Sequence, residues 1–371
     1  MAKTQNPTPT KAIIFCGGVG TRMWPMSRKK SPKQFQELIG NKSMFQTTVN
    51  RVLKGFEPED IYVSTGEEYV DFVKKQAPMI PKKNIIAEPV RRDTLGAVGL
   101  VNLFVYHKFP NAIVAAIWGA DHIVRDVKGF NHAVKKAAEY SNKTKKLVKI
   151  DVRPTFPSEH NGWVKIGGRI SKIDGLDIHE FVKFIEKPNE EKAKKLFKSR
   201  QYLINTGYLV WPAELMHSLF KTHQPKAYKL LEEIRPALGK FRQNKVIRKI
   251  YPKFEKTSID YGIFEKLSKK DTVVIPVDIG WSDVGTWELL FESLAENKKE
   301  DNLIKGQVET SSVKRSIIYS NVKDKIVSVI GLNDVVVVDT QDGLVVCNMH
   351  ESDKIKQFIN LLKEKKLTQY I

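Results

Sequence analysis

A glycine-rich turn and two cations lie close to the N-terminus, directly after a short apolar run at residues 13–16. The glycines are Gly17, Gly18 and Gly20. Glycine lets the backbone approach a ligand closely, and successive N–H groups in such a turn form a concavity that binds anions. Arg22 adds a planar set of hydrogen-bond donors, and Lys33 adds a compact positive charge. These residues predict a loop that binds a triphosphate; the alternative is an ordinary glycine turn beside a solvated Arg22.

The spacing of this turn excludes two common nucleotide-binding loops. A P-loop needs a glycine, four residues and then Gly-Lys-Ser/Thr, and no such string follows the apolar run. The dinucleotide fingerprint needs a third glycine at the position where Met23 stands. The sequence therefore predicts a phosphate-binding loop of another kind.

Two aspartates, Asp121 and Asp283, follow predicted strands and are candidate ligands for Mg²⁺. In proteins this ion is held by one or two carboxylates together with substrate phosphates, whose negative charge it neutralises. Gly119 and Gly285 lie beside the aspartates and leave room for phosphates. The alternative is that Asp121 caps a turn or a helix and that Asp283 lies in a loop. We expect His122 to be structural.

A second set of polar residues follows two further predicted strands. Glu186, Lys187 and Asn205 have the donors and acceptors that sugar hydroxyls and a phosphate monoester require. The alternative is a surface ion pair before a proline turn, with a buried amide at a strand end. The segment at residues 88–94 carries an arginine pair near a helix start, which suits a base or a phosphate but is also compatible with a charged loop.

The elements that must position these residues alternate between apolar β-rich runs and helical patterns. This alternation predicts an α/β fold with a mainly parallel sheet and helices on both faces. Predicted strands at residues 113–117, 181–185, 202–204 and 273–277 each end next to one of the polar groups above. Ligands of such sheets bind beyond the carboxyl ends of the strands, so we expect the four groups to share one rim.

Changes in pattern divide the chain into three parts. Residues 1–10 are polar and are predicted to be a disordered leader, and residues 11–296 form the catalytic domain. Residues 297–371 contain short apolar runs separated by Asn/Asp/Gly turns, followed by a basic helix at about 352–366. They predict a small β domain that could include a few rungs of a β-helix.

Composition and charge restrict the class of protein. The 371 residues include 62 Lys and Arg against 42 Asp and Glu, a net charge of +20 that favours anionic ligands. The basic residues are dispersed without interleaved aromatic residues, so we expect no nucleic-acid partner. The two cysteines predict neither a disulfide framework nor a metal site. No signal peptide or membrane span is recognisable, so we expect a cytoplasmic protein without a membrane partner.

The N-terminal loop resembles a known signature. Residues 17–28, followed by Pro32-Lys33-Gln34-Phe35, are similar to the signature of mannose-1-phosphate guanylyltransferases, with Met23 and Met26 where leucine is usual. The resemblance extends over nearly the whole chain. Further matches are Glu88-Pro89 with Arg92-Asp93-Thr94, Ala120-Asp121-His122, residues 184–188, Asn205-Thr206-Gly207, residues 258–261 and residues 280–287.

The resemblance implies a Rossmann-like (GT-A-like) nucleotidyltransferase that uses Mg²⁺ to make GDP-mannose and pyrophosphate from GTP and mannose 1-phosphate. Catalytic roles are implied for Arg22, Lys33, Asp121 and Asp283, the two aspartates being the metal ligands. Implied nucleotide-binding residues are Gly17, Gly18, Gly20, Thr21, Arg22, Lys33, Glu88, Arg92 and Thr94. Implied sugar-phosphate-binding residues are Gly162, Glu186, Lys187, Asn205, Gly207 and Asp260. The C-terminal β domain favours a homodimer.

Two departures from the family pattern keep alternatives open. Trp118-Gly119 stands where the family has a proline or a small residue, and residues 161–166 replace its Gly-Tyr-Gly-Tyr-Ile sugar loop. These changes favour, as an alternative, the same chemistry with another hexose 1-phosphate or another nucleoside triphosphate. A second alternative is a non-catalytic sensor of nucleotide sugars.

Overall fold

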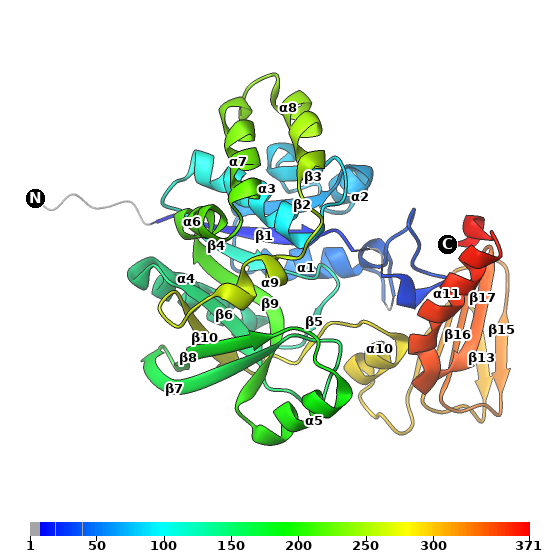
Figure 1. Ribbon diagram of the computed structural model, residues 1–371. Coiled ribbons are helices and arrows are strands. Elements are labelled where there is room, and N and C mark those ends of the chain that lie inside the picture. The colour runs from blue at the N-terminus through cyan, green and yellow to red at the C-terminus, as the bar shows by residue number, and fades with distance from the viewer. Residues whose placement is uncertain (1–7, 19, 39) are drawn as a thin grey trace, which may run out of the picture. The chain divides into compact units, whose positions relative to one another are not determined.

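The computed structural model describes residues 8–18, 20–38 and 40–371, apart from the side chain of Thr21. By their contacts, the residues fall into two compact units (Figure 1). The first unit comprises the chain up to Gly17 with residues 49–119 and 124–281, and the second comprises residues 18–48, 120–123 and 282–371. Most of the predicted leader lies outside the described residues, and strand β1 begins at Thr10. Each unit combines separate stretches of chain, so the two units do not correspond to a single boundary after residue 296. That boundary stays a prediction.

The first unit is built on a nine-stranded sheet with the order β3-β2-β1-β4-β9-β6-β10-β8-β7. The neighbours β3, β2, β1 and β4 are parallel, as are β6 and β10, whereas β9 is antiparallel to both β4 and β6. The strands are β1 Thr10–Cys16, β2 Ile61–Gly66, β3 Ile85–Glu88, β4 Ile113–Ile117, β6 Leu147–Val152, β7 Trp163–Ile173, β8 Leu176–Ile185, β9 Tyr202–Pro212 and β10 Thr272–Val277.

Helices cover both faces of this sheet, which confirms the predicted α/β class. On strand β9, Leu209 and Trp211 pack into the core formed with α3, α6 and α7, while Tyr208 contacts Phe130 of α4 on the opposite face. Successive side chains of a strand point to opposite faces, so one strand contributes to both layers. The helices are α2 Val70–Gln76, α3 Asp93–Lys108, α4 Val127–Thr144, α5 Glu190–Ser199, α6 Ala213–His223, α7 Pro225–Ile234, α8 Gln243–Ile250 and α9 Ile259–Gly262.

One predicted strand end is wrong. The sequence pattern predicts that a strand ends at Ile204, but β9 continues through Asn205, Thr206 and Gly207 to Pro212. The register of the β6–β9 pair shifts between Ile150 and Val152, and Thr206 Oγ1 donates to the Ile150 carbonyl at 2.5 Å. Gly207 suggests a turn in the sequence, but in the structure it lies next to an irregularity inside the strand. Asn205 therefore lies within the sheet, and three of the four polar groups follow strand ends as predicted.

The second unit contains stacked short parallel strands, as expected for a β-helix. Strands β12, β14 and β16 form one parallel layer and β13 and β15 form another, while β17 pairs antiparallel with β16. The sequence pattern misses β12 and β13, which are short and contain no fully buried residue. The elements are α10 Trp287–Leu294, β12 Asn302–Lys305, β13 Val308–Ser311, β14 Ser316–Ser320, β15 Val327–Ile330, β16 Val335–Thr340, β17 Gly343–Asn348 and α11 Ile355–Glu364. Three short elements reach or cross the limits of the units, namely α1 Met44–Val52, β5 Ile123–Val124 and β11 Trp281–Ser282.

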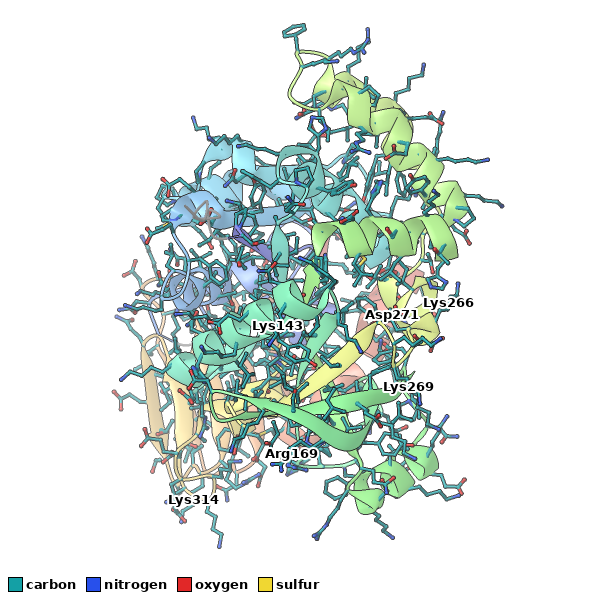
Figure 2. All side chains as sticks on the ribbon, turned by 90° about the vertical axis from the view of Figure 1, so that its left-hand side faces the viewer. Lys143, Arg169, Lys266, Lys269, Asp271 and Lys314 are labelled. Carbon is teal, nitrogen blue, oxygen red and sulfur yellow. The ribbon has the colours of Figure 1, made fainter. Side chains whose placement is uncertain are left out.

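The positive charge of the first unit is spread over separate elements. Figure 2 labels Lys143 at the end of α4, Arg169 on β7, and Lys266 and Lys269 in the segment before β10, all of them exposed. This distribution matches the dispersed basic residues seen in the sequence.

Candidate active site

Gly18, Gly20 and Lys33 belong together in the second unit. Gly20 has φ +65°, and a Cβ atom at this position would lie 2.7 Å from the Cβ of Lys33. A side chain is therefore excluded both by backbone strain and by contact. Lys33 begins a short 3-10 turn after Pro32, and the next residue, Gln34, donates its Nε2 hydrogen to the Gly18 carbonyl at 2.9 Å. The turn that carries Lys33 and the glycine turn thus hold each other in place.

Lys33 joins the two segments that carry the predicted metal ligands. Its side chain is buried, and its Nζ atom lies 2.6 Å from Oδ2 of Asp121. The same Nζ donates to the carbonyl oxygen of Val284 at 2.7 Å, and Val284 directly follows Asp283 in the chain. Val284 has φ +42°, an uncommon conformation for a β-branched residue. One ammonium group therefore connects the Asp121 and Asp283 segments, which are far apart in sequence.

The electrostatics of Asp121 suit a side chain that binds a cation. Burial acts to raise the pKa of this carboxyl, but the Lys33 ammonium and then His122 act in the opposite direction, and the net effect lowers the pKa. The carboxyl is thus ionised at neutral pH, and the side chain is 27% exposed, so it is accessible from solvent. Carboxylate oxygens are hard ligands of the kind that Mg²⁺ prefers, so Asp121 fits this ion and Asp283 offers the same donor type. Within residues 8–18, 20–38 and 40–371, no group of three or more His, Cys, Asp or Glu side chains is arranged to hold a metal.

Arg22 approaches the segment that follows Asp283. A Cβ atom placed on Gly285 would lie 3.5 Å from Nη1 of Arg22, so the guanidinium group lies against this glycine. The structure therefore brings together Arg22, Lys33, Asp121 and the Asp283 segment, to which the family resemblance assigns catalytic roles. The side chain of Thr21, another predicted ligand of the nucleotide, lies outside the described residues.

Other residues of the N-terminal signature hold the loop in the second unit. Trp24 Nε1 donates to the carbonyl oxygen of Tyr370 at 2.6 Å. Arg28 Nε donates to the Pro25 carbonyl at 2.8 Å, and the Arg28 guanidinium also pairs with Asp342 in the turn between β16 and β17. The sequence pattern gives no sign of the contacts to Tyr370 and Asp342, because these partners are more than 300 residues away.

In the first unit, the predicted base-binding residues are engaged with the segment at residues 251–259. Tyr251 Oη donates to Oε2 of the buried Glu88 at 2.6 Å. Burial raises the pKa of Glu88 to about 7, even though the hydrogen bond from Tyr251 favours the ionised form. Arg92 Nε donates to the Pro252 carbonyl at 3.0 Å, and Thr94 Oγ1 accepts from the Ile259 N–H at 2.8 Å. Glu88 and Arg92 therefore hold residues 251–252 in place, and Thr94 holds the start of α9.

The predicted sugar-phosphate residues of the same unit include two acids and one lysine that lie close together. Glu186 pairs with Lys187, and a Cβ atom on Gly162 would lie 2.9 Å from Oε2 of Glu186. Asp260 lies in α9, whose N-terminus is capped by Ser258. Burial, followed by the nearby Glu186 carboxylate, raises the pKa of Asp260 to about 6. The glycine and these side chains are therefore brought together as predicted.

Asn205 contacts the predicted Gly162 and also Lys149, a residue that the sequence analysis does not identify. Its backbone N–H donates to the Gly162 carbonyl at 2.9 Å, and its Oδ1 accepts from Nζ of Lys149 at 2.7 Å. Lys149 and Asp151 are both buried in β6. The one signal in the sequence is their position, since two charged residues interrupt an apolar strand at residues 147–152. Gly207 has φ +75°, and a Cβ atom there would lie 2.6 Å from the Cβ of Trp118.

Comparison with known proteins assigns both parts of the chain. Residues 11–300 match the nucleotidyl transferase family, and residues 307–362 match the MannoseP isomerase/GMP-like beta-helix domain. Among the parts of the chain that the structure describes, no helix is long and apolar enough to cross a membrane.

Curated relatives match over most of the chain. Mannose-1-phosphate guanylyltransferase RfbM of Salmonella typhimurium is 32% identical over 365 residues, which cover 96% of this chain and 73% of the relative. Mannose-1-phosphate guanylyltransferase 2 of Escherichia coli O157:H7 is 31% identical, with 98% of this chain and 75% of the relative covered.

Solved structures share the fold. A crystal structure described as mannose-1-phosphate geranyltransferase from Thermus thermophilus superposes with a TM-score of 0.84 at 24% identity, covering 96% of this chain and 100% of that one. The chain is thus similar in sequence to guanylyltransferases and similar in fold to this structure. It belongs to the mannose-1-phosphate guanylyltransferase family and is an enzyme of the nucleotidyltransferase class.

Proposed function

We propose that the protein transfers a guanylyl group from GTP to α-D-mannose 1-phosphate and releases GDP-mannose and pyrophosphate. The names of the relatives support this choice of substrates. The observation that carries the proposal is Lys33, whose ammonium joins Asp121 to the segment after Asp283 beside the glycine turn. This arrangement supplies the charges that transfer of a nucleotidyl group requires.

The reaction needs little covalent chemistry from the protein. A phosphate oxygen of the sugar phosphate attacks the α-phosphorus of the nucleotide in line, the bond to the β-phosphate oxygen breaks, and pyrophosphate leaves. The attacking phosphate is ionised at neutral pH, so no general base is needed. Catalysis then depends on positioning the two substrates and on stabilising the negative charge that develops in the transition state.

Residues of the second unit are assigned to the triphosphate. The backbone of Gly18 and Gly20, with Gly17 before them and Thr21 after, would surround the phosphates. Lys33 would stabilise charge at the α-phosphate, and Arg22 would bind the leaving pyrophosphate. Asp121 and Asp283 would hold Mg²⁺, which when bound neutralises phosphate charge.

Residues of the first unit are assigned to the rest of the two substrates. Glu186, Asn205 and Asp260, with the backbone at Gly162 and Gly207, would bind sugar hydroxyls, and Lys187 would bind the sugar phosphate. Glu88, Arg92 and Thr94 are assigned to the guanine side of the nucleotide, where their contacts to residues 251–259 would shape the site. A cytoplasmic location and a homodimer stay predictions from the sequence.

Pyrophosphate release measured with Mg²⁺ tests the proposal. GTP, ATP, UTP and dTTP are each combined with mannose, glucose and fucose 1-phosphates. We expect the pair of GTP and mannose 1-phosphate to give the highest rate. A different preferred pair would reassign the substrates. It would also support the view that Trp118 and residues 161–166, where the chain departs from the family pattern, change the substrate preference. Absence of release from folded protein that binds GTP would favour the sensor.

A further inference from the structure

A buried lysine that the proposed reaction does not use lies on an inner strand of the nine-stranded sheet. Lys149 belongs to β6 Leu147–Val152, and its side chain is 2% exposed. Leu147, Lys149 and Asp151 point to the same face of the strand, because side chains alternate along it. Leu147 packs into the large core of the first unit, so Lys149 carries its charge into an otherwise apolar layer.

The surroundings of the Lys149 ammonium direct it toward a neutral group. Its Nζ atom lies 2.7 Å from Oδ1 of Asn205 and 3.8 Å from Oδ2 of Asp151, so the amide is the closer partner. Nζ also lies 5.6 Å from the ring centre of Phe184 and 5.7 Å from that of Phe264. The two rings and Asp151 thus limit where the ammonium can move, and its strongest hydrogen bond is to Asn205.

Asp151 balances the charge of Lys149 from inside the sheet. Its side chain is fully buried, and its Oδ1 accepts from the Thr206 N–H at 3.3 Å. Its Oδ2 has no hydrogen-bond partner among the described residues. Burial raises the pKa of Asp151 to about 6, although Lys149 opposes this effect. Replacing such a buried ion pair by apolar residues is often neutral or stabilising, so folding stability gives a weak reason for its presence.

The contacts of Lys149 decide how the Asn205 amide is oriented. Oδ1 accepts from Lys149 and lies 3.4 Å from the N–H of Gly207, so two donors point at it. If the amide turned over, its NH₂ group would face an ammonium and an N–H, and donor would meet donor. The oxygen and nitrogen of an amide have similar shapes, so the hydrogen-bond partners decide which of the two faces Lys149. The NH₂ group of Asn205 is therefore directed away from Lys149.

We propose that Lys149 is a positioning residue that fixes Asn205 so that its amide NH₂ group is directed at a hydroxyl of the bound mannose 1-phosphate. This inference rests on the proposed function, in which Asn205 binds that substrate. It adds that the contact is a hydrogen bond that the Asn205 NH₂ group donates to a hydroxyl oxygen of the sugar. Asp151 holds the Lys149 charge in place and makes the burial of the ammonium tolerable.

Two variants separate positioning from stability. Lys149→Met removes the ammonium at similar size but leaves Asp151 as an unpaired buried carboxyl, so this variant is expected to be less stable. The double variant Lys149→Met/Asp151→Asn removes both charges, and its new amide oxygen can still accept from Thr206. We expect the double variant to recover the melting temperature of the wild type. The exposed Lys143→Met is the matched control.

The readout is the KM for mannose 1-phosphate in pyrophosphate release at saturating GTP. Asn205→Ala is expected to raise this KM by about tenfold, the value of one hydrogen bond in a binding site. Lys149→Met/Asp151→Asn is expected to raise it by a similar factor, because the amide is then free to turn. In the Asn205→Ala background the same double change is expected to alter KM by less than about twofold, because coupled residues are not additive. The KM for GTP is expected to stay unchanged throughout.

The outcomes are distinguishable. Recovery of both the melting temperature and the sugar-phosphate KM in the double variant would show that Lys149 has only a structural role and would overturn the inference. Additive effects in the Asn205→Ala background would overturn it as well. An unchanged KM in Asn205→Ala would remove Asn205 from the site. Failure of the wild type to use GTP with mannose 1-phosphate would overturn the proposed function itself.

Discussion

The Nζ atom of Lys33 lies 2.6 Å from Oδ2 of Asp121, and this ion pair joins two of the residues proposed to act on the triphosphate. The pair keeps the carboxylate ionised, because the Lys33 charge together with His122 outweighs the effect of burial on the pKa of Asp121. Lys33 reaches the Asp283 segment through the Val284 carbonyl, so a change at this one residue should disturb both predicted metal ligands.

Lys33→Met should lower kcat by at least about 10²-fold, as expected for loss of a preorganised positive charge near a reacting phosphate. Methionine fills a similar volume, so the protein should stay folded. Pyrophosphate release measures the effect, and Lys30→Met, which changes an exposed lysine of the same segment, is the control. Equal activity of the two variants would contradict the role of Lys33.

Asp121→Asn should weaken binding of a divalent cation by at least about tenfold, because an ionised ligand is replaced by a neutral one. The asparagine oxygen can still accept from Lys33, so the fold should persist. Mn²⁺ titration followed by electron paramagnetic resonance, after removal of metals with EDTA, measures the affinity. The exposed Asp278→Asn is the control. Unchanged Mn²⁺ affinity would remove Asp121 from the metal site.

Gly20→Ala should destabilise the protein by about 1–2 kcal/mol for the left-handed backbone alone, with a further cost from contact with the Lys33 side chain. In thermal unfolding, we expect the midpoint to fall by about 1–2 °C per kcal/mol. Gly18→Ala is the matched control for stability, since nothing lies within 4 Å of the added atom. Similar midpoints for the two variants would show that the turn does not need its left-handed residue.

Glu88→Gln should make folding stability less dependent on pH. The carboxyl has a pKa of about 7 in the folded protein and 4.5 as its ordinary value, so the folded state binds more protons between these values. The Glu88 contribution to stability is therefore greatest below about pH 4.5 and is lost as pH rises through 7. Glutamine is neutral throughout and can still accept from Tyr251.

Urea unfolding at pH 5 and pH 8 measures this difference. The stability of Glu88→Gln relative to the wild type should increase from pH 5 to pH 8. The exposed Glu255→Gln is the control, and no change in relative stability is expected for it. A constant difference between Glu88→Gln and the wild type at the two pH values would rule out the raised pKa of Glu88.

The sequence by itself determined the class of fold and most of the candidate site. Alternating apolar runs and helical patterns predict an α/β sheet covered on both faces, because these periodicities are local properties of the chain. The glycine turn with Arg22 and Lys33, and the acids at Asp121 and Asp283, could be found because they occur together as short local motifs after predicted strands. The structure places Gly18, Gly20, Arg22, Lys33, Asp121 and Asp283 in one unit with the C-terminal strands, a grouping that the predicted domain boundary after residue 296 does not contain.

Only the tertiary structure decided which of these residues touch and what surrounds them. The sequence does not reveal that Lys33 joins Asp121 to Val284, that Trp24 and Arg28 anchor the signature loop, or that Lys149 lies against Asn205. These contacts join segments from 56 to 346 residues apart, and no local pattern specifies such pairs. The extension of β9 through Asn205 has the same cause, because pairing with β6 outweighs the local turn tendency of Gly207. Local preferences are worth less free energy than the burial and hydrogen bonding that distant segments gain when they pack.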